Sequence, residues 1–140
     1  MLQFQVAVTL LTFIAASIFV LFHGAAAIVS YHIIFAIGIV PLILGAMVHF
    51  LPVLARSKNP RILIRLLPVV AILGGLLVTS NFAFPHTAPA GHTLGAAIII
   101  VAVASLGIWT YRLRIKAIGK PHPCLDWYLA AMACISMIKR

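Results

Sequence analysis

Long apolar stretches recur along this chain and constrain its fold more than any other feature. A helix needs about 20 apolar residues to cross the hydrocarbon core of a bilayer, and stretches of this kind follow one another here with short polar breaks. They lie near Val6 to Phe22, Tyr31 to Leu51, Ile62 to Ser80 and Leu94 to Tyr111, and a shorter run extends from Leu125 to Ile138. We therefore expect an all-α fold: an integral membrane helical bundle of four spans plus a fifth helix that is short or truncated.

The composition excludes an ordinary soluble domain. Hydrophobic residues make up 64% of the 140 residues and charged residues 8%, whereas soluble domains are about 45–50% apolar and about 25% charged. We expect residues 1–140 to form a single transmembrane domain, with the lipid bilayer as its main surroundings.

A weak internal similarity accompanies this pattern. An offset of 60 residues places His32 over His92. This spacing is compatible with two helical hairpins in the same orientation, 1–60 and 61–120, with the fifth helix at 125–138 as the start of a third. Chance similarity between two apolar hairpins is the alternative interpretation.

The basic residues predict the orientation of the chain. Ten Lys and Arg residues stand against one acid and give a net charge of +9. Most of them follow the second and fourth expected spans, as Arg56, Lys58, Arg61 and Arg65, and as Arg112, Arg114, Lys116 and Lys120. Because basic loops stay on the cytoplasmic side of a membrane, we expect a bacterial inner-membrane protein with a cytoplasmic N-terminus. No nucleic-acid-binding motif accompanies the charge, so nucleic acid is not expected as a partner.

Acidic and cysteine residues narrow the chemistry. The expected spans contain no Asp or Glu, which argues against proton-coupled carriers, because these usually rely on an intramembrane acid. The single acid, Asp126, is expected to be structural, at the positive end of the fifth helix and beside Lys120. Cys124 and Cys134 lie too far apart along one helix for a disulfide within it. The absence of a CxxCH motif excludes covalently attached c-type haem.

Histidine carries the functional prediction. Four of the six histidines fall at the span ends opposite the basic clusters: His23, His32, His86 and His92. Imidazoles from neighbouring helices at one depth can bind iron or copper together. Alternatively, these histidines are interfacial residues without a ligand, and His86, flanked by prolines, is the best candidate for an exposed loop residue. We expect His49 to pack between helices and His122 to be solvated.

Short motifs in the second span resemble a known group of membrane proteins. The segment Ser30-Tyr31-His32-Ile33-Ile34, followed by Gly38 and by Gly45-Ala46-Met47-Val48-His49-Phe50-Leu51-Pro52, is similar to bacterial multi-span proteins related to the NnrS group. More distantly, it resembles the catalytic subunit of haem-copper oxidases. Gly91-His92-Thr93-Leu94 looks like a second such opening. Histidines near the outer ends of helices hold haem in that superfamily, and copper in the true oxidases, so the resemblance implies His32 and His92 as the first candidate ligands.

Departures from that superfamily limit the expectation. The oxidase core has many more spans and a pair of adjacent histidines, and this chain has no His-His pair. Oxygen reduction by the isolated chain is therefore not expected, and an enzyme is not the favoured interpretation. The first hypothesis is a protein that binds haem b, with copper as the alternative, and that transfers electrons or responds to nitric oxide or metal stress. It would complete its site with a partner subunit or a second copy. The second hypothesis is a non-catalytic small membrane subunit, assembly factor or transporter component with structural histidines.

Overall fold

The computed structural model describes residues 2–23, 27–55, 60–83, 90–116 and 123–137, and every regular element in these ranges is a helix. The all-α fold is therefore confirmed. In chain order the elements are α1 (Leu2–His23), α2 (Ala27–His32), the π-helix η1 (Ile33–Ile39), α3 (Val40–Leu54), α4 (Ile62–Ala83), α5 (Gly91–Lys116) and α6 (Cys124–Met137).

Four helical stretches within the described ranges are long and apolar enough to cross a membrane: Leu2–Phe22, Val29–Leu54, Ile62–Phe82 and Gly91–Lys116. These are the four expected spans, and each extends beyond at least one of the two ends that hydropathy predicted. The fourth, for example, continues past Tyr111 through Arg112 and Arg114 to Lys116. Basic side chains suit the last turn of a helix, where the exposed carbonyl groups carry partial negative charge. Hydropathy detects the apolar centre of a span and misses such polar ends.

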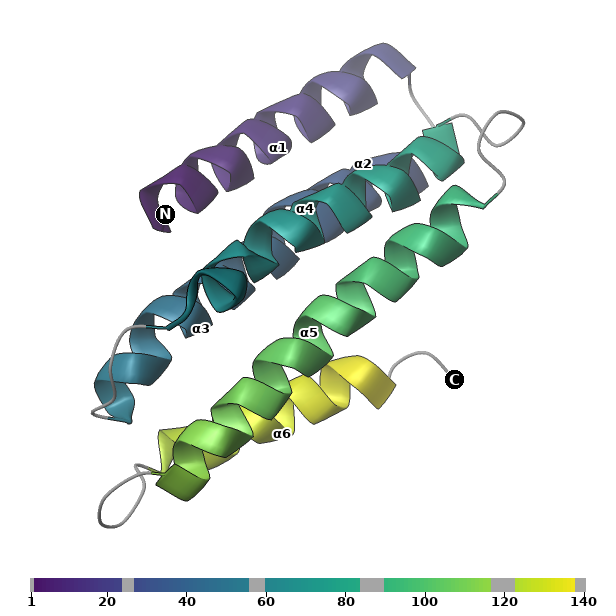
Figure 1. The fold of residues 1–140 in the computed structure, drawn as a ribbon. Helices are drawn as coiled ribbons and strands as arrows, with labels where there is room; N and C mark the ends of the chain where they lie inside the picture. Colours follow the sequence, from purple (N-terminus) through teal and green to yellow (C-terminus); the bar gives the residue numbers. More distant parts are fainter. Residues whose placement is uncertain (1, 24–26, 56–59, 84–89, 117–122, 138–140) are drawn as a thin grey trace.

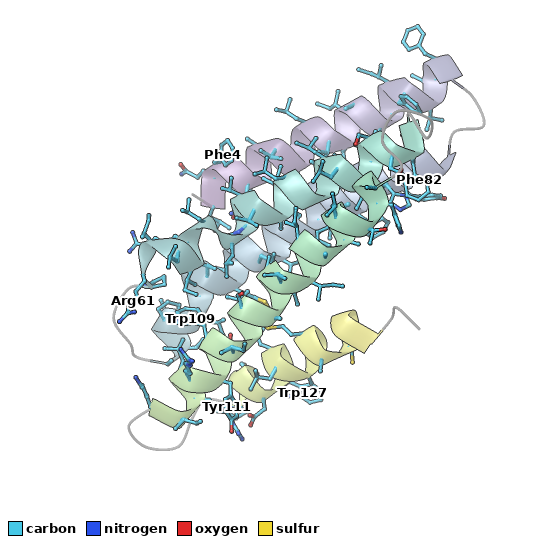
Figure 2. The ribbon with its side chains drawn as sticks, turned by 45° about the vertical axis from the view of Figure 1, so that its right-hand side comes forward. Phe4, Arg61, Phe82, Trp109, Tyr111 and Trp127 are labelled. Atoms are coloured by element: carbon cyan, nitrogen blue, oxygen red, sulfur yellow. The ribbon has the colours of Figure 1, made fainter. Side chains whose placement is uncertain are left out.

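The spans lie side by side and reverse direction at each end of the bundle (Figure 1). One end, which we call the basic end, contains the C-terminal parts of α3 and α5 and the start of α4. Arg61 and Tyr111 lie at this end, and Phe82 lies at the opposite one (Figure 2). We call the opposite end the histidine end, because His32 and His92 lie there at helix termini. The described basic residues of the two clusters therefore share one end, as the alternation of spans predicted.

Helix α1 presents a polar face to the rest of the bundle. Its buried residues recur at helical spacing and include Gln5, Thr9 and Thr12, which are 2%, 7% and 7% exposed. Large apolar residues such as Leu21, 81% exposed, point outward instead. Lipid is as apolar as leucine, so helices in a bilayer associate through close packing and interhelical hydrogen bonds rather than through apolar burial. The polar face of α1 is suited to this kind of association.

A π-helical segment interrupts the second span directly before Pro41. A proline inside a helix favours a bend, because it has no backbone N–H to donate. In the structure the backbone N–H of Val40 donates to the carbonyl oxygen of Phe35, five residues earlier, as in a π-helix.

The Thr9 hydroxyl of α1 contacts this π-helical segment. It lies 3.2 Å from the Gly38 carbonyl oxygen of η1 and 2.9 Å from the Gln5 carbonyl oxygen of its own helix. Helix α1 thus supplies a hydrogen-bond donor to the irregular backbone.

Removal of this donor is expected to weaken the bundle measurably. We predict that Thr9→Val lowers the free energy of unfolding by about 0.6 kcal/mol, and by at most about 1.7 kcal/mol, which is the range for interhelical hydrogen bonds in membranes. Thr110→Val is the matched control, because the buried Thr110 hydroxyl donates to Leu106 of its own helix, at 2.8 Å. Unfolding by SDS titration, followed by circular dichroism, measures both variants. Equal losses in the two variants would contradict an interhelical role for Thr9.

Helices α4 and α5 approach most closely at two glycines. A Cβ atom on Gly74 would lie 2.9 Å from the Gly95 carbonyl oxygen, and one on Gly95 would lie 2.8 Å from the backbone nitrogen of Val78. On another face of α4, a Cβ atom on Gly75 would lie 2.6 Å from the carbonyl carbon of Ala36 in η1. Small residues at these positions let the backbones of neighbouring helices touch, which is typical of helix contacts in membranes.

Helix α6 does not have the length of a span, and it packs against α5 and α3 near the basic end (Figure 1). Met132 anchors it, 5% exposed, in the core cluster with Leu51 and Leu106. Asp126 in its first turn forms an ion pair with Arg114 of α5, with Nε and Oδ1 2.6 Å apart. Asp126 is thus structural, as expected, but its observed partner is Arg114. The expected neighbour, Lys120, lies outside the described residues. Because both side chains are about half exposed, the pair orients α6 more than it stabilises the fold.

Candidate ligand site

His32 and His92 meet at the histidine end through a shared neighbour, Phe82. The ring centroids of His32 and Phe82 are 4.2 Å apart, with the planes tilted by 35°. Those of Phe82 and His92 are 5.4 Å apart, in an edge-to-face arrangement at 83°. The three rings come from α2, α4 and α5, and we refer to them as the ring cluster. Two histidines that are 60 positions apart in the sequence thus lie on the same aromatic side chain.

The backbone packing described above positions this cluster. His32 is the last residue of α2 and directly precedes η1, which Gly75 of α4 contacts at Ala36. His92 is the second residue of α5, one turn before Gly95, where α5 touches α4. Both histidine-bearing segments are therefore held at backbone contact distance from α4, near the helix end that carries Phe82. Glycine packing against α4 thus helps to set the positions of the two imidazoles.

An apolar cavity of about 420 Å³ begins at the two histidines. It follows α5 from His92 to Ile108 and is bounded on another side by Met132 of α6. Apart from the imidazoles, its lining consists of aliphatic side chains, methionine and glycine. Pockets of about 300–1,000 Å³ that are mostly apolar with a few polar groups are the usual form of a small-molecule site. The cavity can hold a largely apolar small molecule. The imidazole nitrogens could bind a metal or a hydrogen-bonding group at one end of that molecule.

Only two of the four predicted ligands, His32 and His92, have side chains that the structure describes. His23 ends α1, and its side chain lies outside the described residues, as do His86 and His122. The expectation that His49 packs between helices is wrong. Its side chain is exposed at the basic end, with its ring edge-to-face on Phe50 at 5.1 Å. Gly45 lies one helical turn before His49, and the space beside it is filled by the side chain of Gln5 from α1.

The described residues contain no group of three or more His, Cys, Asp or Glu side chains that could hold a metal ion. A copper site of the electron-transfer type uses two histidines, a cysteine and a weak axial ligand. Neither Cys124 nor Cys134 lines the cavity with the histidines. A haem needs only one or two axial ligands, because its porphyrin supplies the others. The two imidazoles of His32 and His92 match the number of axial ligands that a haem can take from a protein.

Two features of the site were missed at the level of the sequence. Phe82 could not be identified from the sequence, because aromatic residues near span ends are common. Its contacts with both imidazoles are what distinguish it. The buried polar residues Gln5, Thr9 and Thr12 of α1 were not predicted either, although their spacing in an apolar span indicates a helix–helix face.

A scan of protein-family models and searches of curated proteins and of solved structures gave no match to this chain.

Proposed function

We propose that this protein binds haem b in the apolar cavity, with His32 and His92 as its candidate axial ligands. The observation that carries the proposal is that both histidines line one end of the same apolar cavity of about 420 Å³. The short motifs around His32 and His92, which resemble the NnrS group and haem-copper oxidases, support the same assignment. Copper is the alternative metal, and it would need further ligands beyond these two imidazoles.

The properties of the site are compatible with this cofactor. The walls of the cavity are aliphatic, and the polarity of the surroundings is one of the factors that set a haem's reduction potential. Phe82 contacts both imidazoles, so a flat cofactor that reached either nitrogen would have to stack against Phe82 or displace it. A bound haem would supply one-electron chemistry, or a binding position for a diatomic gas such as nitric oxide if only one histidine ligates it.

The cellular setting belongs to the same proposal. The four apolar helices are compatible with a multi-pass membrane protein. We place the basic end in the cytoplasm of a bacterial cell by the positive-inside rule, which puts the ring cluster toward the outer face of the inner membrane. A partner subunit or a second copy of this chain would then exchange electrons at that face.

A reduced-minus-oxidised visible spectrum of the detergent-purified protein, expressed with haem precursor, tests the proposal. We expect b-type bands, with loss of most of the haem from His32→Ala and from His92→Ala. His49→Ala is the matched control, because this histidine lies at the opposite end of the bundle, and it should retain the bands. A monodisperse, helical protein that shows no bands when supplied with haem would overturn the proposal.

A structural role for the histidines is the second candidate function. It is favoured by the direct contact of both imidazoles with Phe82, which lets them act as packing residues in a small non-catalytic subunit. Under this alternative His32→Ala and His92→Ala would lower stability without any spectroscopic change. The same purified variants, measured by SDS titration, therefore separate the two functions.

A further inference from the structure

A second cavity lies at the basic end, far from the ring cluster along the helix axes. Its volume is about 490 Å³, and it is enclosed by the start of α1, the second half of α3 and the start of α4. Four polar side chains line it: Gln3, Gln5, His49 and Arg65. Proline residues Pro52, Pro60 and Pro68 form much of the remaining wall. Because proline has a fixed φ angle, these parts of the wall are stiff.

Gln5 is the unusual member of this cavity. Its side chain is 2% exposed and presses against Gly45 of α3, and its Oε1 atom has no hydrogen-bond partner among the described residues. Buried carbonyl oxygens in proteins nearly always accept a hydrogen bond. Gln5 also lines the cavity, so a small shift of its side chain away from Gly45 would let a ligand with a hydroxyl or ammonium group supply that donor.

The charge of the cavity points to an anion. Arg65 lies in the first turns of α4, where the free N–H groups of the helix also favour negative charge. Asp126 is the only acidic residue in the chain, and it pairs with Arg114 of α5. No carboxylate of this chain is therefore left to neutralise Arg65. Guanidinium groups bind phosphate with two parallel hydrogen bonds, and His49 adds a further donor or acceptor beside it.

We propose that this cavity binds the headgroup of an anionic phospholipid that carries free hydroxyl groups, such as phosphatidylglycerol. The phosphodiester would interact with Arg65 and His49, and a glycerol hydroxyl would donate to Oε1 of Gln5. A lipid suits the position better than a free anion does, because apolar Leu2 and Val48 also line the cavity and can contact the acyl chains. Basic pockets between spans on the cytoplasmic side are typical sites for anionic lipid headgroups.

Native mass spectrometry of the purified full chain, supplied with single lipids, tests the proposal. Phosphatidylglycerol, phosphatidic acid and phosphatidylcholine with identical acyl chains are compared. We expect phosphatidylglycerol to be retained at least about fivefold better than phosphatidylcholine, the factor that one basic contact provides, and Arg65→Gln to remove the preference. Gln5→Leu should weaken phosphatidylglycerol but not phosphatidic acid, which lacks the glycerol hydroxyls.

Arg61→Gln is the matched control, because Arg61 is exposed at the same end but does not line the cavity. An equal loss in Arg61→Gln and Arg65→Gln would reveal diffuse attraction to a basic surface and overturn the site. Equal retention of phosphatidylglycerol and phosphatidylcholine would overturn it too. Inorganic phosphate is also added in excess. If it binds by itself and displaces the lipid, the cavity is a site for a free anion, and the lipid proposal is overturned. Circular dichroism and size-exclusion chromatography exclude misfolded variants. None of these readouts depends on haem.

Discussion

Gly95→Ala is expected to be among the most destabilising single-methyl additions in this protein. A Cβ atom at this position would meet backbone atoms of Gly74 and Val78 in α4, and a methyl group of Val78 as well. Helices α4 and α5 would have to move apart, and overpacking of this kind costs about 1–3 kcal/mol. The SDS concentration at the unfolding midpoint, followed by circular dichroism, measures the loss.

Gly107→Ala is the matched control for this substitution. Gly107 lies in the same helix, and a Cβ atom there would meet only the sulfur of Met132, at 3.5 Å, which is an ordinary contact. Alanine is a better helix former than glycine by about 1 kcal/mol in water. We therefore expect Gly107→Ala to leave stability unchanged or to raise it slightly. If both variants lose stability equally, glycine packing between α4 and α5 is not what holds this interface.

Ala96→Phe is expected to abolish haem binding without removal of a ligand. Ala96 lines the apolar cavity one turn after His92, so a phenyl ring at this position would occupy the space beside the imidazoles. A filled cavity cannot admit a porphyrin, and haem per protein should fall at least about tenfold, which corresponds to a loss of roughly 1.4 kcal/mol in binding free energy. The pyridine haemochrome assay on purified protein gives this ratio.

The neighbouring position provides the control for the cavity test. Ala97 is exposed and is not part of the cavity lining, so Ala97→Phe adds the same ring on the outward face of the same helix. Its haem content should match that of the unaltered protein. Full haem occupancy in Ala96→Phe would mean that haem, if bound through His32 or His92, lies outside this cavity.

The sequence predicted the elements of the fold well because membrane insertion is governed by local properties. A run of about 20 apolar residues forms a span whatever its neighbours are, so the four spans could be located from hydropathy alone. Their ends were placed too early, for example at Tyr111 in place of Lys116, because a helix continues into polar residues that hydropathy counts as loop. The fifth helix could not be placed, since its position depends on Met132 in the core and on the ion pair of Asp126 with Arg114.

The candidate site was only partly visible in the sequence. His32 and His92 could be selected by their depth in the spans, but depth does not determine whether two side chains face each other. That depends on helix rotation, which here follows from the π-helix after His32 and the glycine contact of Gly95 with α4. His49 was misplaced for the same reason, because the face of α3 beside Gly45 had already been filled by another helix.

Taken alone, the amino-acid order determined the helical class of this protein, the four stretches that are apolar enough to cross a membrane and the end at which positive charge collects. These follow from the free energy of each segment in lipid and from the cost of moving basic residues across a membrane. The tertiary structure decided which polar groups meet: two imidazoles on Phe82, and Gln5 beside Arg65 in a common cavity. Such meetings depend on close backbone contacts between helices that are distant in the sequence, and no local pattern encodes them.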